Sequence, residues 1–323
     1  MKPTVLGGLG LLAMAAAGLP LQGHAQTFPN KPVRMVVPQA PGGASDPLAR
    51  IVGQKLSEKS GQPVLVENRA GAGGNIGMDA VAKATGDGHT LLMSYVGSHA
   101  INVSIYKKLP FDPEVDFVAV ATLANVPFVA AATAALPVSN IKELAAYAAK
   151  NPVSFGSAGN GSVNHLLGEM FASASQAKML HVPYKGAAPA LTDLIAGQIQ
   201  LVFTSLPSVA QHIRAGTVKG LGVTGDQRAQ AFKDIPIVAE SGYPGFVINP
   251  WFGLFAPRST PPAAAAQINA DIRQILQDRD TLEKFAVLGA EPLDSTPQAF
   301  AAMLTKDIKT WAAVVKSSGA SAE

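Results

Sequence analysis

Four segments of the sequence place glycines and hydroxyl side chains at the ends of predicted strands. They are 37–46 (VPQAPGGASD), 94–98 (SYVGS), 156–162 (GSAGNGS) with His165 in the helix that follows, and Thr204 with Ser205. Such loops offer free backbone N–H groups and helix N-termini, which can replace the hydration shell of a carboxylate. A phosphate more often attracts lysine or arginine as well, and these loops hold almost no basic side chains. The four loops together predict a carboxylate site, whereas each loop alone also fits an ordinary glycine turn.

The first of these loops, 37–46, shows how glycines and polar residues would together form a carboxylate site. Gly42 and Gly43 let the backbone approach a ligand closely. Ser45 or Asp46 is expected to cap the helix that follows.

Catalytic and metal-binding patterns are weak. A nucleophile elbow requires G-x-S-x-G, which none of the serine-containing loops matches. Ser162 and His165 are close enough in sequence to pair, but no motif places an acidic residue to orient the histidine. Four more histidines have neither each other nor carboxylates at metal-ligand spacing; they are His89, His99, His181 and His212. We therefore expect no catalytic residue and no metal, with a secreted esterase using Ser157 or Ser162 as the enzymatic alternative.

The glycine-rich string NRAGAGGNIGMDAVAKA, at 68–84, resembles a nucleotide-binding loop at first sight. Gly71 and Gly73 fit the first two positions of G-x-G-x-x-G, but the third falls on Ile76, with Gly77 one residue late. The Gly-Lys-Ser/Thr of a phosphate-binding loop is absent. The string is therefore interpreted as a structural turn that seats a helix, and no cofactor is expected.

Strand-like and helix-like segments alternate along the chain. The predicted strands are 33–37, 64–67, 90–94, 117–123, 128–132, 153–156, 180–182, 199–204, 220–223 and 246–255. The predicted helices are 46–60, 77–84, 141–151, 164–174, 188–196, 206–215, 262–277, 280–288 and 297–317. This alternation is typical of α/β proteins whose parallel sheets are covered by helices on both faces.

One segment departs from the alternation and indicates two domains. Residues 117–132 hold two β-like runs with no helix between them, and a second long extended run, 247–256, follows the middle third. A chain needs two such segments to leave one domain, build a second and return. We expect domain one at 27–124 plus 247–323, domain two at 125–246, and a ligand cleft between them. Trp251 and Phe252, in the returning run, would line this cleft or pack beneath it.

The amino end and the composition indicate an exported protein. Residues 1–25 combine Lys2, an apolar stretch and small residues ending at Ala25, the pattern of a cleaved Sec-type signal peptide. The 323 residues include no cysteine, which excludes disulfides and a lipid-anchored amino terminus. The 25 basic and 22 acidic residues give a net charge of +3, with no basic run that interleaves aromatics, so no nucleic-acid partner is expected.

Several long strings resemble one family. FPNKPVRMVVPQAPGGASDPLAR, GQPVLVENRAGAGGNIGMDAVAKATGDGHTLLM, HVPYKGAAPALTDLIAGQIQLVF and VAESGYPGFVINPWFGLFAPRSTP are similar to the substrate-binding proteins of tripartite tricarboxylate transporters, the Bug family. The resemblance implies a monomeric, periplasmic, type II binding protein with two α/β domains. Such a protein closes on a small organic carboxylate and delivers it to the subunits of a membrane permease. The family binds no nucleotide, although it shares the AGAGGNIG string. The resemblance therefore implies that these glycines are scaffold, at the rim of the cleft or on the docking surface.

The resemblance also implies which residues hold the carboxylate, mainly through loop backbone amides and ordered water. In domain one these are Gly42, Gly43, Ala44 and Asp46, with Gly97 and Ser98 nearby, and in domain two Ser157, Gly159, Ser162, His165, Thr204 and Ser205. Side chains around Phe128, Trp251 and Thr204 are expected to select among citrate-like, dicarboxylate, amino-acid and aromatic ligands. A ligand-sensing partner of a membrane histidine kinase would use the same closed state and is the second functional alternative.

Overall fold

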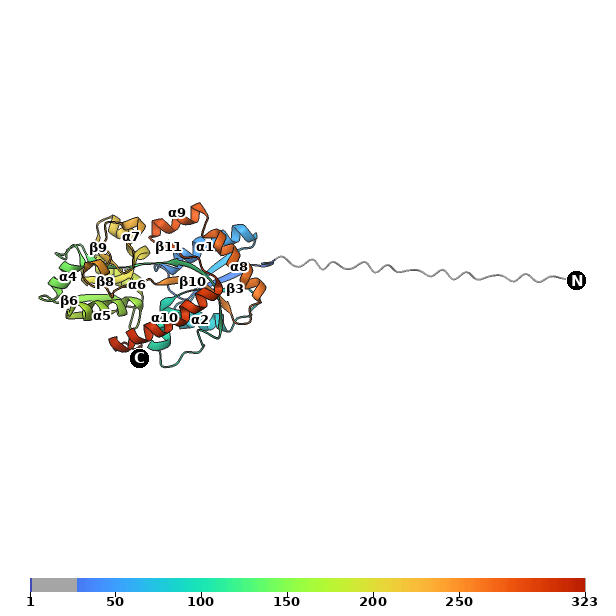
Figure 1. Cartoon of the computed structure of the whole chain (residues 1–323), viewed down its shortest axis with the longest axis horizontal. Helices are drawn as coiled ribbons and strands as arrows, with labels where there is room; N and C mark the ends of the chain where they lie inside the picture. Colours follow the sequence, from blue (N-terminus) through green and yellow to red (C-terminus); the bar gives the residue numbers. More distant parts are fainter. Residues whose placement is uncertain (2–27, 323) are drawn as a thin grey trace.

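The computed structural model describes residues 28–322 together with Met1. The predicted signal peptide, 1–25, lies outside the described residues apart from Met1. The described chain forms two β-sheets flanked by helices, seen as two lobes along the horizontal axis of Figure 1. The α/β fold class predicted from the sequence is confirmed.

The first sheet has six strands in the order β11-β4-β10-β3-β1-β2. These are β1 (Val33–Val37), β2 (Val64–Asn68), β3 (Thr90–Tyr95), β4 (Phe117–Asn125), β10 (Trp251–Pro257) and β11 (Glu291–Pro292). Its central strands are almost fully buried, which agrees with their continuous apolar sequence. The strands β1 and β3 pair in parallel, so their carboxyl ends open on the same edge of the sheet.

The second sheet has five strands in the order β7-β6-β8-β5-β9. These are β5 (Phe128–Thr133), β6 (Val153–Ser157), β7 (Met179–Pro183), β8 (Leu201–Ser205) and β9 (Val218–Val223). β6 pairs in parallel with both β7 and β8, so the loops after these three strands also leave from one edge.

The expectation of parallel sheets is wrong for the strands that connect the two lobes. β10 runs antiparallel to β3 and β4, and β5 runs antiparallel to β8 and β9. β5 follows β4 of the first sheet after a two-residue connection, and β10 is reached from β9 of the second sheet through an irregular segment with two short 3-10 helices. Neither strand is the second strand of a βαβ crossover within its own sheet, so the right-handed βαβ rule does not set its direction. Both sheets are therefore mixed.

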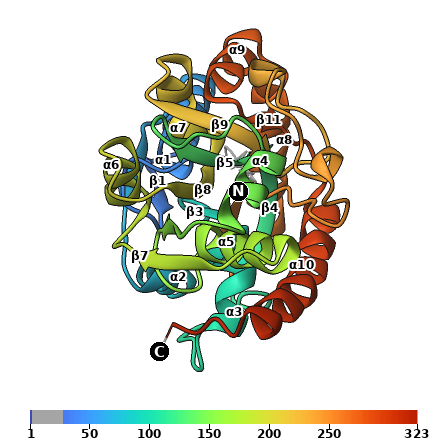
Figure 2. The ribbon, with the colours of Figure 1, turned by 90° about the vertical axis from the view of Figure 1, so that its left-hand side faces the viewer.

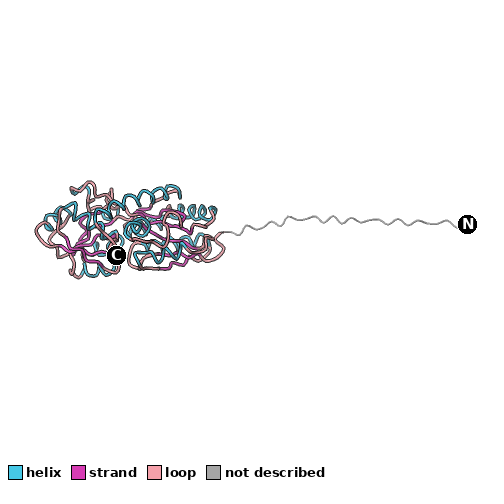
Figure 3. The backbone as a smooth tube through the Cα atoms, turned by 90° about the horizontal axis from the view of Figure 1, so that it is seen from below, coloured by secondary structure: helices cyan, strands magenta, loops and turns pink. Residues whose placement is uncertain are grey.

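Helices cover both faces of each sheet (Figure 3). The first sheet packs α1 (Ser45–Ser60), α8 (Pro262–Ile275) and α9 (Arg279–Leu288) on one face, and α2 (Asn75–Ala82) and α10 (Pro297–Ser318) on the other. The second sheet packs α4 (Ile141–Ala148) and α5 (Val163–Ser175) on one face, and α6 (Ala187–Ile195) and α7 (Leu206–Arg214) on the other. A segment predicted only as a loop, after β3, forms a π-helical turn η2 (Gly97–Ile101) continued by the short α3 (Asn102–Ile105).

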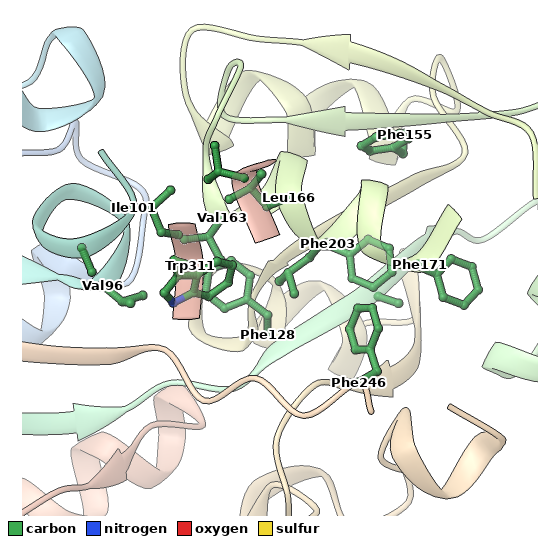
Figure 4. Packing of buried hydrophobic residues seen from close by; sticks show 14 of the residues in the cluster. Val96, Ile101, Phe128, Phe155, Val163, Leu166, Phe171, Phe203, Phe246 and Trp311 are labelled. Atoms are coloured by element: carbon green, nitrogen blue, oxygen red, sulfur yellow. The ribbon is translucent and has the colours of Figure 1, made fainter. Parts of the chain in front are cut away.

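One hydrophobic cluster continues from one lobe into the other (Figure 4). Ile101 and Trp311 belong to the first lobe, whereas Val163 and Phe203 belong to the second, and all four are buried. Burying a side chain of this size contributes about 1.5–3 kcal/mol. α10 adds to the contact because it runs along the side of the molecule from the first sheet to α5 and α3 (Figure 2).

The two crossing segments between the sheets lie side by side. β4 ends at Asn125, whose partner in the antiparallel register is Trp251, the first residue of β10. The N–H of Val126 donates to the carbonyl of Pro250 at 2.9 Å. The chain therefore leaves the first sheet and returns to it along one narrow two-stranded ribbon.

Candidate functional site

A cavity of about 590 Å³ lies between the two lobes. The first lobe lines it with the loop after β1, the turn 70–74, Gly97 at the start of η2, and Phe252. The second lobe lines it with the loops after β6 and β7, and with Thr204 and Ser205 at the end of β8. The structure thus brings all four loops singled out in the sequence to one cavity.

Five α-helices of the described chain have N-caps that line the cavity. α1, α2, α6 and α7 have no side-chain hydrogen bond at their N-caps, which are Ala44, Gly74, Gly186 and Ser205. α7 offers fewer free N–H groups than the others, because the N–H of Leu206 donates to the carbonyl of Pro127 and Pro207 has none. α5 is capped by Ser162, whose hydroxyl accepts from the N–H of His165. N–H groups without a side-chain cap leave partial positive charge at the cavity wall, and this is the chemistry that favours an anion.

The expected capping of α1 by Ser45 or Asp46 is wrong. The helix already includes Ser45, and its N-cap is Ala44. The Asp46 carboxylate instead pairs with the guanidinium of Arg50 one turn later, at 3.0 Å. The side chain of Asp46 is thereby turned to the helix surface, and Ser45 rather than Asp46 lines the cavity.

The loop after β6 is held from behind by side chains. The hydroxyls of Ser157 and Ser162 both donate to the carbonyl of Gly159, at 3.1 and 2.7 Å. The N–H of Gly161 donates to Nδ1 of His165 at 3.1 Å. These bonds fix the loop backbone, so Ser157 and His165, which do not line the cavity, act on its shape from the protein side.

A pair of stacked histidines supports this loop. The rings of His165 and His181 lie 3.9 Å apart, and His181 Nε2 is 2.6 Å from the hydroxyl of Ser157. Desolvation, with a smaller repulsion from His165, lowers the pKa of His181 to about 4. Desolvation also lowers the pKa of His165. Both rings are therefore neutral near pH 7. The serine–histidine hydrogen bond of this loop joins Ser157 to His181, and not Ser162 to His165 as the sequence suggested.

A second network holds the first-lobe wall. Gln39 Nε2 donates to the hydroxyl of Ser98 at 2.9 Å, and that hydroxyl donates to the carbonyl of Gly73 at 2.9 Å. Asn102 Nδ2 donates to the same carbonyl at 3.1 Å and to Asn75 Oδ1 at 2.7 Å. Ser98 is buried behind the cavity wall, and its contact is with the glycine-rich turn.

Aromatic rings supply the apolar part of the lining. Tyr95 stacks on Phe252 with ring centroids 5.4 Å apart, and Phe128 and Tyr106 line the cavity as well. Burial raises the pKa of Tyr95 to about 12, so its phenol stays protonated. Trp251, expected to help select the ligand, does not line the cavity: successive strand residues face opposite sides, and its ring packs on Phe300.

Of the twelve residues predicted to contact a ligand, seven line the cavity: Gly43, Ala44, Gly97, Gly159, Ser162, Thr204 and Ser205. The other five lie beside or behind the wall: Gly42, Asp46, Ser98, Ser157 and His165. Gly42 has a φ of +97°, and a Cβ at this position would lie 3.4 Å from the Cβ of Ala188 in the other lobe. It therefore marks the place where the two lobes approach each other.

The sequence indicates one lining segment only in outline and another not at all. The turn 70–74, expected as scaffold at the cleft rim or on the docking surface, lines the cavity itself. The segment between β7 and α6, which includes Lys185, is not among the expected loops. Among the described residues that line the cavity, Lys185 is the one with a cationic side chain. A loop between a strand and an uncapped helix, YKGAAP, was the signal that could have revealed it.

Within residues 28–322, no group of histidine, aspartate and glutamate side chains has a metal-binding arrangement. The same part of the chain has no helix with the length and apolar character needed to cross a membrane.

A family profile described as "Tripartite tricarboxylate transporter family receptor" matches residues 48–320. The chain belongs to this receptor family. Protein BugT of Bordetella pertussis is 37% identical over 310 residues, which are 95% of each chain. The tripartite tricarboxylate receptors are periplasmic solute-binding proteins and not enzymes, in agreement with the family expected from the sequence.

Solved structures of similar chains agree with this fold. The R. palustris protein Rpa4515 with adipate is 35% identical with a TM-score of 0.87, over 91% of this chain and 99% of that one. MatC from Rhodopseudomonas palustris with bound malate is 33% identical with a TM-score of 0.82, over 89% of this chain and 100% of that one. The periplasmic binding protein BugD is 36% identical with a TM-score of 0.85, over 91% and 99%.

Proposed function

We propose that this receptor captures a small organic carboxylate in the cavity between its lobes and delivers it to the membrane permease of a tripartite transporter. The observation that carries the proposal is the convergence of uncapped helix N-termini from both lobes on one cavity. The adipate and malate bound by two structural relatives support a carboxylate as the ligand.

The chemistry of the wall explains why a carboxylate is favoured. Backbone N–H groups at helix N-termini supply partial positive charge without a fixed counter-ion. Lys185 adds one full charge, and none of the described lining residues is acidic. Aromatic rings on the same wall can cover the carbon skeleton of the ligand.

Ligand capture would proceed by hinge closure. Domain one, 27–124 plus 247–323, and domain two, 125–246, would move about the paired crossing segments. A ligand that bonds to both domains binds the closed form more tightly than the open form, and this differential affinity shifts the population toward closure. The contacts would come from Gly43, Ala44 and Gly97 in domain one, and from Gly159, Ser162, Thr204 and Ser205 in domain two. The other five expected residues would shape the wall without touching the ligand: Gly42, Asp46, Ser98, Ser157 and His165.

The location and assembly follow from the same role. Residues 1–25 would be a cleaved Sec-type signal peptide that sends a monomer to the periplasm, where the closed form meets the permease subunits. Amino-terminal sequencing of the protein recovered from the periplasmic fraction tests the cleavage after Ala25.

A thermal-unfolding screen tests the binding role. The purified mature protein would be heated with L-malate, adipate, citrate, glutamate, benzoate and ATP. A ligand at about 100 times its Kd stabilises the fold by about 2.7 kcal/mol, a shift of several degrees. A shift with one class of carboxylate and none with ATP is expected. A flat response to every acid in the panel would count against the proposed function.

A further inference from the structure

The turn that interrupts the glycine-rich string has an unusual backbone. Gly71, Ala72, Gly73 and Gly74 all have positive φ, at 131°, 46°, 64° and 102°. Ala72 is one of two non-glycine residues with positive φ in the described chain, and the other, Gln176, is the ordinary left-handed C-cap of α5. Strained backbone of this kind persists only where its surroundings hold it in place.

The surroundings of the turn supply that support. A Cβ on Gly74 would lie 2.4 Å from the hydroxyl of Ser98, and one on Gly73 would lie 2.8 Å from the hydroxyl of Tyr106. The carbonyl of Gly73 accepts hydrogen bonds from both Ser98 and Asn102. The glycines are therefore needed because the turn packs directly against the side chains of Ser98 and Tyr106 behind it, and not because it binds a nucleotide.

The carbonyl side of the turn is satisfied, but part of its N–H side is not. The N–H of Gly74 donates to Gly71, and the N–H of Asn75 donates to Ala72. Within residues 28–322, the N–H groups of Ala72 and Gly73 have no protein acceptor. Both residues are exposed, and both line the cavity.

We propose that the turn 71–74 is a ligand contact, in which the N–H groups of Ala72 and Gly73 donate to an oxygen of the bound carboxylate. Ser98 and Asn102 are the positioning residues, because they anchor the Gly73 carbonyl behind the wall. This inference rests on the proposed function. It assigns the glycine-rich string a direct role in the site, and it explains why Ser98 lies behind the cavity rather than in it.

The first test uses the unaltered protein. Amide resonances of the ¹⁵N-labelled mature chain are followed during titration with L-malate, adipate, citrate and benzoate, and Kd is measured calorimetrically for each. With every acid that binds, the amides of Ala72 and Gly73 should shift together with those of the loop after β6.

The second test uses a pair of matched variants, Gly73→Ala and Gly61→Ala. The two glycines have almost the same conformation, with φ and ψ of 64° and 15° for Gly73 and 69° and 7° for Gly61. Gly61 lies at the end of α1, outside the cavity lining, and a Cβ added there would have no other atom within 4 Å. Gly73→Ala should raise Kd for the tightest acid of the panel about tenfold or more, and Gly61→Ala should leave it within about twofold.

The positioning residues are tested by Ser98→Ala against Ser94→Ala. Ser94 is also buried in the same lobe, but its hydroxyl has no hydrogen-bond partner in the described chain. Ser98→Ala should weaken binding and reduce the ligand-induced shift of the Gly73 amide, whereas Ser94→Ala should change neither.

The outcomes separate the two proposals. Binding with no shift at Ala72 and Gly73, and equal Kd for Gly73→Ala and Gly61→Ala, would overturn the turn contact and leave the proposed function standing. No binding of any of the four acids to the unaltered protein would count against both. Binding with a selective loss in Gly73→Ala and Ser98→Ala would support the contact.

Discussion

At the scale of single residues, the cavity wall is built from backbone whose conformation is set by neighbouring hydroxyl side chains, of which Ser98 and Ser157 lie behind the wall. Ser157 and Ser162 fix the carbonyl of Gly159, and Ser98 fixes that of Gly73. Each hydroxyl donates a hydrogen bond to a backbone carbonyl that would otherwise lack a partner at the cavity surface. Substitutions behind the wall are therefore expected to affect binding as strongly as substitutions in it.

Replacing Gly42 by valine should abolish carboxylate binding and leave the fold intact. At φ +97° a side chain costs about 1–2 kcal/mol, and at Gly42 it would also meet Ala188 of the other lobe. Gly216→Val is the control, because Gly216 has a φ of +71° and open space around it. Calorimetric titration with adipate or L-malate and thermal unfolding would be measured for both variants. Undiminished affinity in Gly42→Val would exclude this loop from the closing contact.

The histidine pair should make stability depend on pH. The pKa of His181 in the fold, about 4, lies below the ordinary value of 6.5, so the unfolded chain takes up the proton first as the pH falls. Stability is expected to decline between pH 6.5 and about pH 4. His181→Phe should remove about 2 kcal/mol of that decline, which allows for the partial exposure of the ring.

Urea unfolding of both proteins at several pH values would measure this effect. The free energy of unfolding should fall more steeply between pH 6.5 and about pH 4 in the unaltered protein than in His181→Phe. Parallel pH profiles would show that the ring titrates normally in the fold. His99, whose pKa burial lowers to about 3, stays in both proteins and contributes equally.

At the scale of elements, the two lobes are joined on the side of the molecule where α7 faces α9. Both terminal nitrogens of Arg214 donate to the carbonyl of Val287 at 3.1 Å, and the same guanidinium lies 4.7 Å from the ring centroid of Phe232. This bond joins the end of one helix in each lobe, and it can exist only when the lobes are close together.

Replacing Arg214 by alanine should therefore weaken the closed form. A hydrogen-bonding loss of about 1 kcal/mol corresponds to about a fivefold rise in the Kd for adipate or L-malate, with faster dissociation. Arg279→Ala is the control, because Arg279 is exposed on α9 and pairs with Glu283 of the same helix. Stopped-flow dissociation rates would be compared. Equal rates in the two variants would show that the α7–α9 contact does not stabilise closure.

Much of this architecture follows from local sequence. The β-branched runs predicted β1 to β9 to within a few residues. Parallel strands end at a common edge, so the loops after β1 and β3 share one edge of the first sheet and those after β6 and β8 share one edge of the second. The packing of the two lobes then brings both edges to one cavity. Hydrophobic periodicity carries no strand direction, so the antiparallel β10 was not predictable from it. Nor does it tell which residue of a buried strand faces a cavity, so the sequence leaves both Trp251 and Phe252 as candidates, and only the structure shows that Phe252 lines the cavity.

Other parts of the site depend on tertiary packing. The turn that holds Ala72 at positive φ packs against Ser98, Asn102 and Tyr106, which lie about thirty residues further along the chain and contact Gly73 and Gly74. The parallel pairing of β6 with β7 brings Ser157 close to His181. The spacing of these two residues in the sequence matches no catalytic motif. The family resemblance indicated loops that the structure brings to one cavity, but the division between wall and support required the structure.

At the scale of the whole molecule, recognition by backbone dipoles predicts a weak dependence on salt. Lys185 is the one cationic side chain among the described lining residues, so few charge pairs are available for screening. Raising NaCl from about 0.05 to about 0.5 M should change the Kd for adipate less than about threefold. Lys185→Met should remove most of the remaining dependence. If the affinity for adipate fell by several tens of fold over this range of NaCl, surface charges rather than the helix N-termini would hold the anion.

The side-by-side crossing segments restrict the mechanical freedom of the molecule. Because the N–H of Val126 donates to the carbonyl of Pro250, a rotation about the backbone bonds of one segment must also move the other. Two adjacent tethers permit bending across the line that contains them and oppose twisting about the long axis. The lobes should therefore open and close by one dominant hinge rotation, so the same residues face each other in every closed form.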